Sequence, residues 1–538
     1  MEFLSSVLVI RVERAYRRAS RHCGPGRALG LQALSRGRIV WGNAPHNHHQ
    51  QLVPTMPHAP ILVWFQSDLR LADHRALQAA LAAGAPVIPV FILDDSAAGS
   101  WVPGGASRWW LHGSLASLAR DLEHRGSRLI LRRGGTLAEL HKLVTETGAL
   151  AVHFSRRYEP AARMLEDEVK SGLDPIGVAC KRFGGSLLFE PESVRSKTND
   201  VYKVFTPFWR AACAGDTPRL AAAAPKRLPT PATWPVSDKL ETWGLLPTSP
   251  DWAGGLRDGW TPGETGAQEQ LTLFMADALT AYKEDRDRPD RPGTSRLSPH
   301  LHFGEISPAM IWHEIKATQT MQPRTEASAA KFLAEIGWRE FSYHLLFNFP
   351  HLPETAFRAD FAGFPWRDDG ARLRAWQRGE TGYPIVDAGM RQLRQTGWMH
   401  NRVRMVVASF LVKHLLIPWQ AGEAWFWDNL VDADLASNAA SWQWVAGCGA
   451  DAAPYFRIFN PMTQGEKFDP DGGYVRTFVP ELAKLRTDYI HAPWTAPALE
   501  LAAAGIKLGK TYPHPIVDHS EARDAALAAF QSLKVAAS

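Results

Sequence analysis

The feature that most limits the fold of this chain is a regular alternation of strand and helix patterns over residues 61–180. Apolar runs such as ILVWF at 61–65 and VIPVFIL at 87–93 predict buried strands, and helical patterns separate them. This alternation is typical of a parallel sheet with helices on both faces. We therefore predict a doubly wound, Rossmann-like α/β domain with strands at 61–65, 87–93, 128–131, 149–154 and 176–180, and helices at 76–83, 107–124, 137–147 and 160–170. No GxGxxG motif follows the first strand, so the sequence does not support dinucleotide binding there.

Beyond residue 269 the pattern becomes almost entirely helical, which predicts an all-α second domain. Residues 184–264 are rich in proline and lack a long periodic run, as expected of an interdomain connection. Helices are predicted at 271–282, 327–347, 389–396, 402–416 and 423–430. The resulting division is a leader at 1–55, the α/β domain at 56–185, a linker at 186–265, the helical domain at 266–516 and a C-terminal tail at 517–538.

The net charge of the chain does not by itself indicate nucleic-acid binding. Of the formal +5, residues 1–55 contribute eight Arg and two Glu, so the rest carries 52 basic and 53 acidic side chains. Any DNA-binding surface in the body of the chain must therefore be a local cationic patch. The 21 Trp residues are notable because indoles either fill cores or stack on rings and bases.

The first 55 residues are Arg-rich and acid-poor, a composition shared with transit peptides. We favour an upstream start or a disordered leader, because the first core strand begins at residue 61, soon after Met56. The four cysteines form no CxxC pair and no zinc spacing, which favours a reducing compartment and predicts no metal site. No apolar run is long enough to span a bilayer.

Residues 432–444 concentrate chemistry on one predicted helix. Asp434, Asn438 and Trp442 recur every four residues and so share a face, whereas Trp444 points elsewhere. This segment by itself is equally compatible with a buried amphipathic helix that has tryptophans in the core.

Three further segments carry polar groups that suit a ligand. The loop at 293–298 combines a glycine, hydroxyls and an arginine before a helical run, which suits a phosphate, although an ordinary N-cap has the same pattern. Glu335 and Trp338 share a helix face, so the carboxylate could hydrogen-bond the edge of a base while the indole stacks on its plane. The alternative is a surface glutamate beside a tryptophan of the core. Residues 398–405 are polar and basic within an apolar region, and Arg404 is placed to reach Asp432 or Asp434.

The order and number of these motifs resemble the photolyase/cryptochrome family over roughly residues 57–516. The motifs that carry the resemblance are GTSRLS at 293–298, WREF at 338–341, TGYPIVDA at 381–388, GWMHNR at 397–402, the 432–444 segment and residues 451–464. The resemblance implies an N-terminal antenna domain and a C-terminal helical domain that binds FAD. It assigns cofactor binding to Tyr282, Thr294, Ser295, Arg296, Leu297, Ser298, Arg339, Asn401, Arg404, Asp432, Asp434 and Asn438, and light-driven electron transfer to Trp442, Trp419 and Trp366.

The resemblance also implies what the site does. It suggests light-driven repair of cyclobutane pyrimidine dimers by electron transfer from excited reduced FAD to a flipped lesion. The lesion pocket would be formed by Glu335, Trp338, Asn401, Met405 and Trp444, and DNA would be held by Arg286, Trp338, Arg402, Trp444 and Arg457. The alternative is a cryptochrome-type blue-light receptor. Asn401, Met405 and Asn438, together with the lack of a long regulatory tail, favour dimer repair.

The remaining expectations concern the second chromophore and the setting. Residues 104–112 and 155–160 are similar to the class III or plant-cryptochrome-like branch, which favours 5,10-methenyltetrahydrofolate as antenna. After Tyr158-Glu159 the chain continues with Pro160-Ala-Ala-Arg163 and lacks the Asn-Glu that binds folate in well-known bacterial members of the family, so deazaflavin, a second flavin or no antenna stays open. We expect the partner to be UV-damaged single- or double-stranded DNA, and the protein to be a monomer that acts on the nucleoid in a bacterial cytoplasm.

Overall fold

The computed structural model describes residues 59–451 and 456–536, so the predictions for the leader lie outside the described residues. Residues 57–538 form one compact unit, which begins with five parallel strands in the order β3-β2-β1-β4-β5. The strands are β1 (Ile61–Phe65), β2 (Val87–Leu93), β3 (Ile130–Arg133), β4 (Ala151–Ser155) and β5 (Ala179–Phe183).

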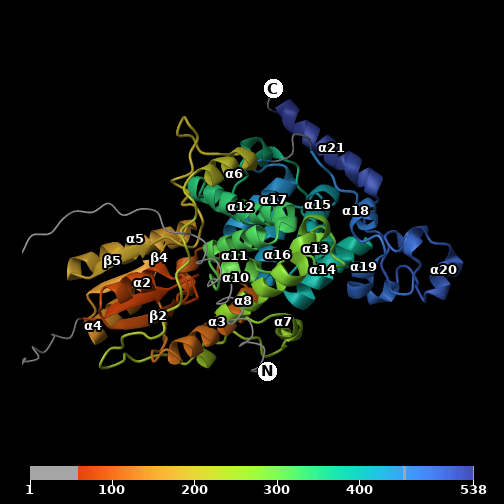
Figure 1. Ribbon diagram of the computed structural model, residues 1–538. Coiled ribbons are helices and arrows are strands. Elements are labelled where there is room, and N and C mark those ends of the chain that lie inside the picture. The colour runs from red at the N-terminus through yellow and green to blue at the C-terminus, as the bar shows by residue number, and fades with distance from the viewer. Residues whose placement is uncertain (1–58, 452–455, 537–538) are drawn as a thin grey trace, which may run out of the picture. The chain divides into compact units, whose positions relative to one another are not determined.

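Alternate residues of β1 serve two cores, because successive side chains of a strand point to opposite faces. Ile61, Val63 and Phe65 pack against α2 (Arg75–Ala82) and α3 (Gly105–Glu123). Leu62 and Trp64 pack against α4 (Thr136–Thr147) and α5 (Pro160–Leu173). The sheet is thus doubly wound, as predicted, and lies at one end of the unit in Figure 1.

The last strand differs from the prediction. Residues 174–176 form a 3₁₀ turn that ends at Gly177, which has a φ of 76°, and β5 begins only at Ala179. The apolar residue at 176 belongs to the turn and the one at 178 lies between the turn and the strand, whereas every residue of the edge strand β5 is at least partly exposed. The apolar pattern therefore placed the strand three residues too early.

The connecting segment holds short helices and covers the other edge of the sheet. The Asp238 amide donates to the Leu131 carbonyl oxygen (2.9 Å), and the Leu131 amide donates to Ser237 Oγ (3.0 Å), so residues 237–238 shield β3. The helices here are α6 (Phe205–Ala214) and α7 (Gly254–Gly259).

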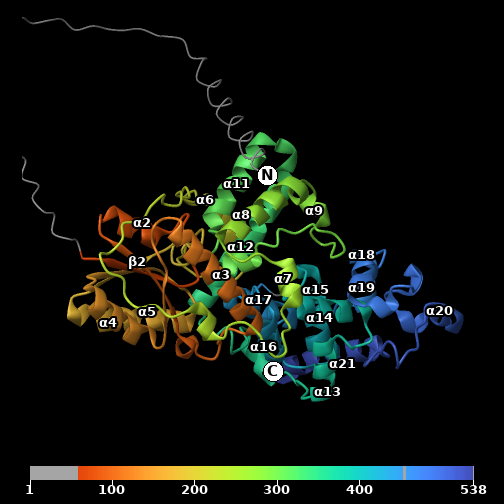
Figure 2. The ribbon, with the colours of Figure 1, turned by 90° about the horizontal axis from the view of Figure 1, so that it is seen from below.

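The rest of the chain is helical, as predicted, and no described helix is long and apolar enough to cross a membrane. In Figures 1 and 2, α18, α19 and α20 lie on the side of the helical domain away from the sheet. The helices are α8 (Glu264–Leu273), α9 (Tyr282–Asp285), α10 (Ser298–His302), α11 (Pro308–Met321), α12 (Glu326–Asn348), α13 (Gly370–Arg378), α14 (Pro384–Thr396), α15 (Asn401–Ser409), α16 (Trp419–Asn429), α17 (Leu435–Ala446), α18 (Pro461–Phe468), α19 (Gly473–Phe478), α20 (Ala498–Ala503) and α21 (His519–Ala536).

Two predicted helices are interrupted. The helix predicted at 271–282 is broken by a π-helical turn and a 3₁₀ turn before α9 starts at Tyr282. The helix predicted at 402–416 ends in a π-helical turn, Phe410–His414, whose five side chains are all buried. The π-helical and 3₁₀ turns are short and continue the helical path of the chain, so the 3.6-residue periodicity of the sequence does not distinguish them from α-helix.

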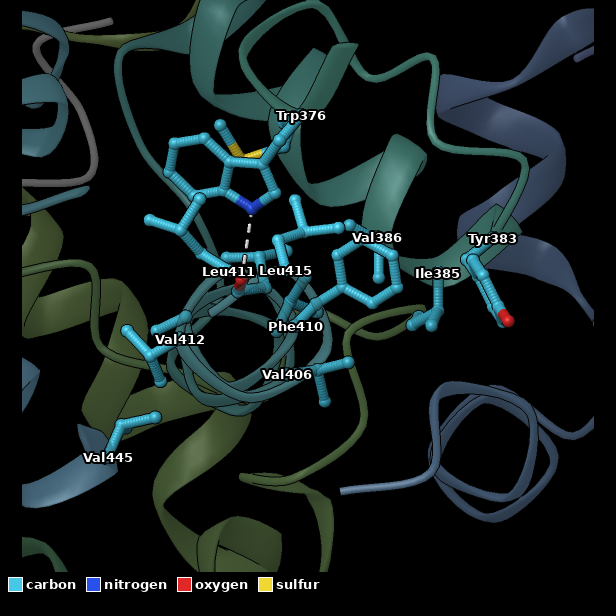
Figure 3. Packing of buried hydrophobic residues seen from close by; sticks show 14 of the residues in the cluster. Trp376, Tyr383, Ile385, Val386, Val406, Phe410, Leu411, Val412, Leu415 and Val445 are labelled. Carbon is cyan, nitrogen blue, oxygen red and sulfur yellow. Dashed lines mark hydrogen bonds between the residues drawn. The ribbon is translucent and has the colours of Figure 1, made fainter. Parts of the chain in front are cut away.

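The core of the helical domain surrounds α15. Figure 3 shows Phe410, Leu411 and Leu415 beneath the indole of Trp376, whose N–H donates to the Val407 carbonyl oxygen (3.0 Å). The C-terminal α21 joins this core through Ala526, Ala529 and Leu533, so the segment expected as a tail contributes to the packing of the helical domain.

Candidate functional site

The first part of the site is the N-terminus of α17. Asp434 is the N-cap, and its carboxylate accepts a hydrogen bond from the Ser437 amide (2.7 Å). Tyr343 Oη on α12 donates to the same carboxylate, and His302 Nδ1 lies 4.0 Å from it. Burial opposes ionisation, but the nearby His302 and the charge of Arg339 hold the pKa of Asp434 well below its usual range. The carboxylate is therefore charged at neutral pH and fixed from three helices.

Asp432 is fixed by a second cation. Arg404 Nη2 donates to both Asp432 carboxylate oxygens (3.0 and 2.8 Å), and Arg404 Nε donates to the Met399 carbonyl oxygen (2.8 Å). The predicted pairing of Arg404 with one of these aspartates is confirmed for Asp432.

Asn438 follows one turn after the cap and is also buried. Its side-chain amide donates to the backbone oxygen of Glu423 on α16 (3.1 Å). The Glu423 carboxyl itself is buried with neither oxygen hydrogen-bonded, and burial, with a contribution from Glu354, raises its pKa to about 9. Glu423 is thus a neutral acid beside Asn438.

The phosphate-type loop at 293–298 is tightly folded. A Cβ on Gly293 would lie 2.7 Å from the backbone oxygen of Asp285, so glycine is required there by close approach. The N-cap of α10 is Leu297, without a side-chain cap, so this loop is not an ordinary Ser N-cap.

Arg296 of this loop turns towards the α/β side. Its guanidinium lies over the Trp260 ring (4.0 Å to the centroid), and Nη2 donates to the Gly259 oxygen (3.2 Å). Thr294 and Ser295 remain partly exposed, and Ser298 is exposed. Phosphate contact by these side chains stays a prediction.

Tyr282 and Arg339, two residues predicted to bind the cofactor, have different surroundings. Tyr282 is buried against Phe274 and Phe332, and burial raises its pKa. Arg339 lies over the Tyr343 ring (4.8 Å) and donates to the Ser186 carbonyl oxygen (2.9 Å).

The second part of the site is more open. Trp338 is half-buried on α12, and Phe205 of α6 stacks flat on it, with 3.8 Å between ring centroids and 10° between planes. Glu335, one turn earlier, is ion-paired with Arg286 and with Lys331 (3.1 Å). The carboxylate predicted to contact a base is therefore held by two cations in this structure.

The start of α15 faces the same region. Asn401 is exposed and Met405 half-buried. Arg402 pairs with Asp287 (2.9 Å), and its Nη1 donates to Met405 Sδ (3.7 Å). Arg402 also lines a hollow of about 560 Å³ with Asp287, Arg457, Ile458, Phe459, Asn460, Thr463, Gln464, Lys467 and Phe468.

The two tryptophans of α17 separate as predicted. Trp442 is buried on Gly422 and Phe426 of α16, whereas Trp444 is half-buried and its indole N–H donates to the Asp451 carbonyl oxygen (3.0 Å). Trp419 and Trp366 belong to the same hydrophobic cluster as Trp442, although Trp366 is only partly buried.

Sequence reasoning missed several residues of this site: Tyr343, His302, Phe205, Trp376 and Lys467. Trp376 packs edge-on against Trp442, with centroids 6.2 Å apart. Tyr343 lies four residues after Arg339 on α12, so helical spacing could have revealed it. Phe205 lies more than a hundred residues from Trp338 and leaves no local signal.

Comparisons with known proteins identify the relatives of this chain. Residues 61–232 match the family model of DNA photolyase, and residues 332–532 match that of the FAD-binding domain of DNA photolyase. The chain is 55% identical over 476 residues to the deoxyribodipyrimidine photo-lyase of Agrobacterium fabrum, covering 88% of this chain and 98% of that protein. The chain belongs to the photolyase/cryptochrome family.

Within this family, the chain is more similar to the photolyases named here than to the cryptochrome. A class III photolyase from Agrobacterium tumefaciens superposes with a TM-score of 0.87 at 54% identity, over 90% of this chain and 99% of that chain. Cryptochrome-1 of Arabidopsis thaliana is 40% identical over 86% of this chain and 69% of that protein. The α/β and helical architecture is thus that of the family, and the predicted fold class is confirmed.

The residues of the site fit the FAD that this family binds. Among the described residues, the buried nitrogens without a hydrogen-bond partner include Nε of Arg286, Arg296 and Arg402, and Nε2 of His400. Burial lowers the pKa of His400 to about 4, and its Nδ1 accepts from the Arg402 amide (3.2 Å), so Nε2 carries the proton and is a donor. Phosphate oxygens and flavin carbonyls are acceptors, so these unpaired donors suit them.

Proposed function

We propose that this protein repairs cyclobutane pyrimidine dimers in UV-damaged DNA with light as the energy source. The observations that carry the proposal are a hollow lined by Arg402, Arg457 and Lys467 and two half-buried tryptophans, Trp338 and Trp444. Arg402 in the hollow contacts Met405, and Arg286 pairs with Glu335 one turn before Trp338. Cations hold a phosphate backbone, and indoles stack on bases, so this combination suits a flipped lesion.

DNA binding begins at the hollow. Arg402, Arg457 and Lys467 attract the phosphates, while Asn460 and Gln464 offer neutral hydrogen bonds. Because the body of the chain has almost no net charge, this patch supplies the local field that steers DNA.

Lesion binding follows between Trp338 and Trp444. Flipping a damaged base pair costs a few kcal/mol, and stacking on each indole returns about 1–3 kcal/mol. We expect Glu335, Asn401 and Met405 to complete the same pocket and to hold the flipped bases by hydrogen bonding and contact.

Bound FAD would supply the light absorption and the electron that splits the dimer. The protein's own part is to hold charge near that group. Asp432 with Arg404 and Asp434 with Tyr343 fix the carboxylates, and Asn438 presents its amide beside neutral Glu423. Trp442, Trp419 and Trp366 form the route by which electrons reach the cofactor from the surface.

The α/β domain is proposed to hold an antenna, with 5,10-methenyltetrahydrofolate favoured and deazaflavin or a second flavin as alternatives. The similarity to a class III photolyase supports folate, whereas a Sulfolobus tokodaii photolyase structure contains two FAD molecules. An absorption spectrum of chromophore extracted from the purified protein distinguishes the three. We further propose that the protein acts as a monomer on chromosomal DNA in the cytoplasm.

The test uses purified protein with reduced flavin, thymine-dimer DNA and blue light. Dimers are expected to disappear in the light and to persist in the dark. If dimers persist in the light while FAD is bound, repair is wrong and the cryptochrome alternative, a light receptor without repair, is favoured. Protein purified without flavin absorbance would contradict both.

A further inference from the structure

The residue Asp451, which follows α17, bonds to Trp444 and to Phe205, the ring that stacks on Trp338, and the inference drawn from it rests on the proposed function. One wall is Trp338 on α12 and the other is Trp444 on α17. Asp451 contacts the first through Phe205 and the second directly. The two contacts come from different atoms of one residue, so moving Asp451 moves both walls.

The carboxylate of Asp451 fixes the Trp338 wall. Its Oδ2 accepts from the amide of Phe205, the first residue of α6 (3.1 Å), whereas the N-cap residue Val204 supplies no side-chain cap. A carboxylate at a helix N-terminus satisfies a free N–H and is favoured by the helix dipole. This bond therefore sets where α6 begins and hence where the Phe205 ring lies.

Phe205 in turn sets the usable surface of Trp338. Its ring covers one face of the indole at 3.8 Å, and Trp209 continues the stack at 6.3 Å from Phe205 with 11° between planes. An indole has two faces, so a base can stack only on the one that Phe205 leaves open. Trp209 lies against Gly337 of α12, where a Cβ would approach its ring to 2.6 Å. The stack of Trp338, Phe205 and Trp209 is therefore packed against α12.

The backbone of Asp451 fixes the Trp444 wall. Its carbonyl oxygen accepts from the Trp444 indole N–H (3.0 Å), which fixes the tilt of that ring. Asp451 has a φ of 55°, a left-handed conformation that Asp and Asn adopt more readily than Ala.

We propose that Asp451 is a positioning residue that sets the separation and tilt of Trp338 and Trp444, and thereby the selectivity of the pocket for a dimer over undamaged bases. It acts through Phe205 and Trp444 and not on the substrate. A cap that served α6 alone would affect stability without changing this selectivity.

Three substitutions separate the role of the Asp451 carboxylate, which bonds to Phe205, from the role of its backbone, which bonds to Trp444. Asp451→Asn keeps both an oxygen acceptor and the tolerance for positive φ. Asp451→Gly keeps the backbone conformation but removes the carboxylate. Asp451→Ala removes the carboxylate and strains the backbone. Asp369→Ala is the matched control, because Asp369 caps α13 by accepting from the Arg372 amide (2.9 Å) away from the pocket.

The measurement is binding in the dark of flavin-loaded protein to thymine-dimer DNA and to the same DNA undamaged. Asp451→Ala should weaken dimer binding about tenfold, as expected for walls misplaced by a fraction of an ångström, and leave undamaged DNA binding unchanged. The dimer affinity of Asp451→Gly should lie between those of wild type and Asp451→Ala, and the dimer affinity of Asp451→Asn should stay within about twofold of wild type. Asp369→Ala should lower the melting temperature without changing the ratio of the two affinities.

A double-mutant cycle supplies the second test. Trp444→Phe keeps an aromatic ring but removes the N–H donor and part of the stacking surface. Only the part of its effect that comes from the bond to the Asp451 carbonyl oxygen should shrink in the Asp451→Ala background, where strain at a φ of 55° displaces that oxygen. Equal dimer selectivity in wild type, Asp451→Gly and Asp451→Ala, or equal losses in Asp369→Ala, would overturn the inference. A wild-type protein that does not prefer dimer DNA, or does not repair it in light, would instead overturn the proposed function.

Discussion

The flavin side and the lesion side of α17 are built in different ways. On the flavin side, Asp432, Asp434 and Asn438 are all buried, and each is held by at least one partner from another segment. On the lesion side, Trp338 and Trp444 are half-buried and Asn401 is exposed. A buried charge costs several kcal/mol unless it is paired, whereas an exposed side chain carries no such requirement.

The difference separates stability from selectivity. Substitutions on the flavin side should disturb folding and cofactor binding together. Substitutions on the lesion side should change DNA recognition and leave the fold intact. Trp442 and Trp444 show that one helix serves both purposes, because a rotation of about 200° over two residues takes a side chain from core to pocket.

The largest effect is expected for Asp434→Ala. It leaves the Tyr343 hydroxyl and the charge of Arg339 without their buried partner, so unfolding free energy should fall by roughly 3–5 kcal/mol and flavin should be lost. Urea unfolding and flavin absorbance measure both effects. Asp369→Ala removes an N-cap on the surface helix α13 and should cost only about 1 kcal/mol with flavin retained. Similar losses in the two variants would contradict the comparison.

Glu423→Gln tests a buried acid next to Asn438 whose two carboxyl oxygens accept no hydrogen bond from the described residues. The folded-state pKa of about 9 exceeds the ordinary 4.5, so the folded protein keeps a proton that the unfolded chain releases. Wild-type stability attributable to this group is therefore full below pH 4.5 and is lost as pH rises towards 9. Because Gln cannot ionise, the free energy of unfolding of the variant should rise relative to that of wild type, by at most about 4–5 kcal/mol at pH 8.

Urea unfolding at pH 5 and pH 8 measures this gain. Glu380→Gln is the control, since Glu380 is half-exposed and paired with Arg378 at the surface. A difference between Glu423→Gln and wild type that does not depend on pH would show that the Glu423 carboxyl is ionised in the folded protein.

Trp338→Ala should have a moderate effect on binding and little on the fold. Loss of one stacking surface is worth about 1–3 kcal/mol, or roughly 5- to 150-fold in affinity for dimer DNA. Fluorescence anisotropy measures the affinity, and the melting temperature reports the fold. The control is Trp252→Ala, which removes an indole that is 43% exposed outside the site. Unchanged dimer affinity in Trp338→Ala would place the pocket elsewhere.

The smallest effect is expected for Lys467→Ala at the rim of the hollow. Lys467 is exposed and provides charge without base contact, so damaged and undamaged DNA should both bind a few-fold more weakly. The slope of log affinity against log salt should fall by about one. Lys316→Ala on α11 removes an exposed charge away from the hollow and should leave the slope unchanged. A selective loss for damaged DNA would mean that Lys467 reads the lesion.

The sequence by itself determined the local features of this protein. Alternating apolar runs predicted the parallel sheet, helical periodicity predicted the second domain, and four-residue spacing placed Asp434 and Trp442 on one side of α17 and Trp444 on another. The sequence also predicted that Arg404 pairs with Asp432 or Asp434, because buried cations require partners, and the structure selects Asp432. Each of these depends on backbone geometry or charge over short stretches.

Only the tertiary structure decided which distant residues complete the site. The stack of Phe205 on Trp338, the bonds of Asp451 to Phe205 and Trp444, and the burial of Glu423 join segments whose separation carries no periodic signal. The π-helical turn at Phe410–His414 and the late start of β5 are likewise set by packing. Periodicity reports which face of an element is buried, but the partner on that face is chosen by how the elements pack in three dimensions.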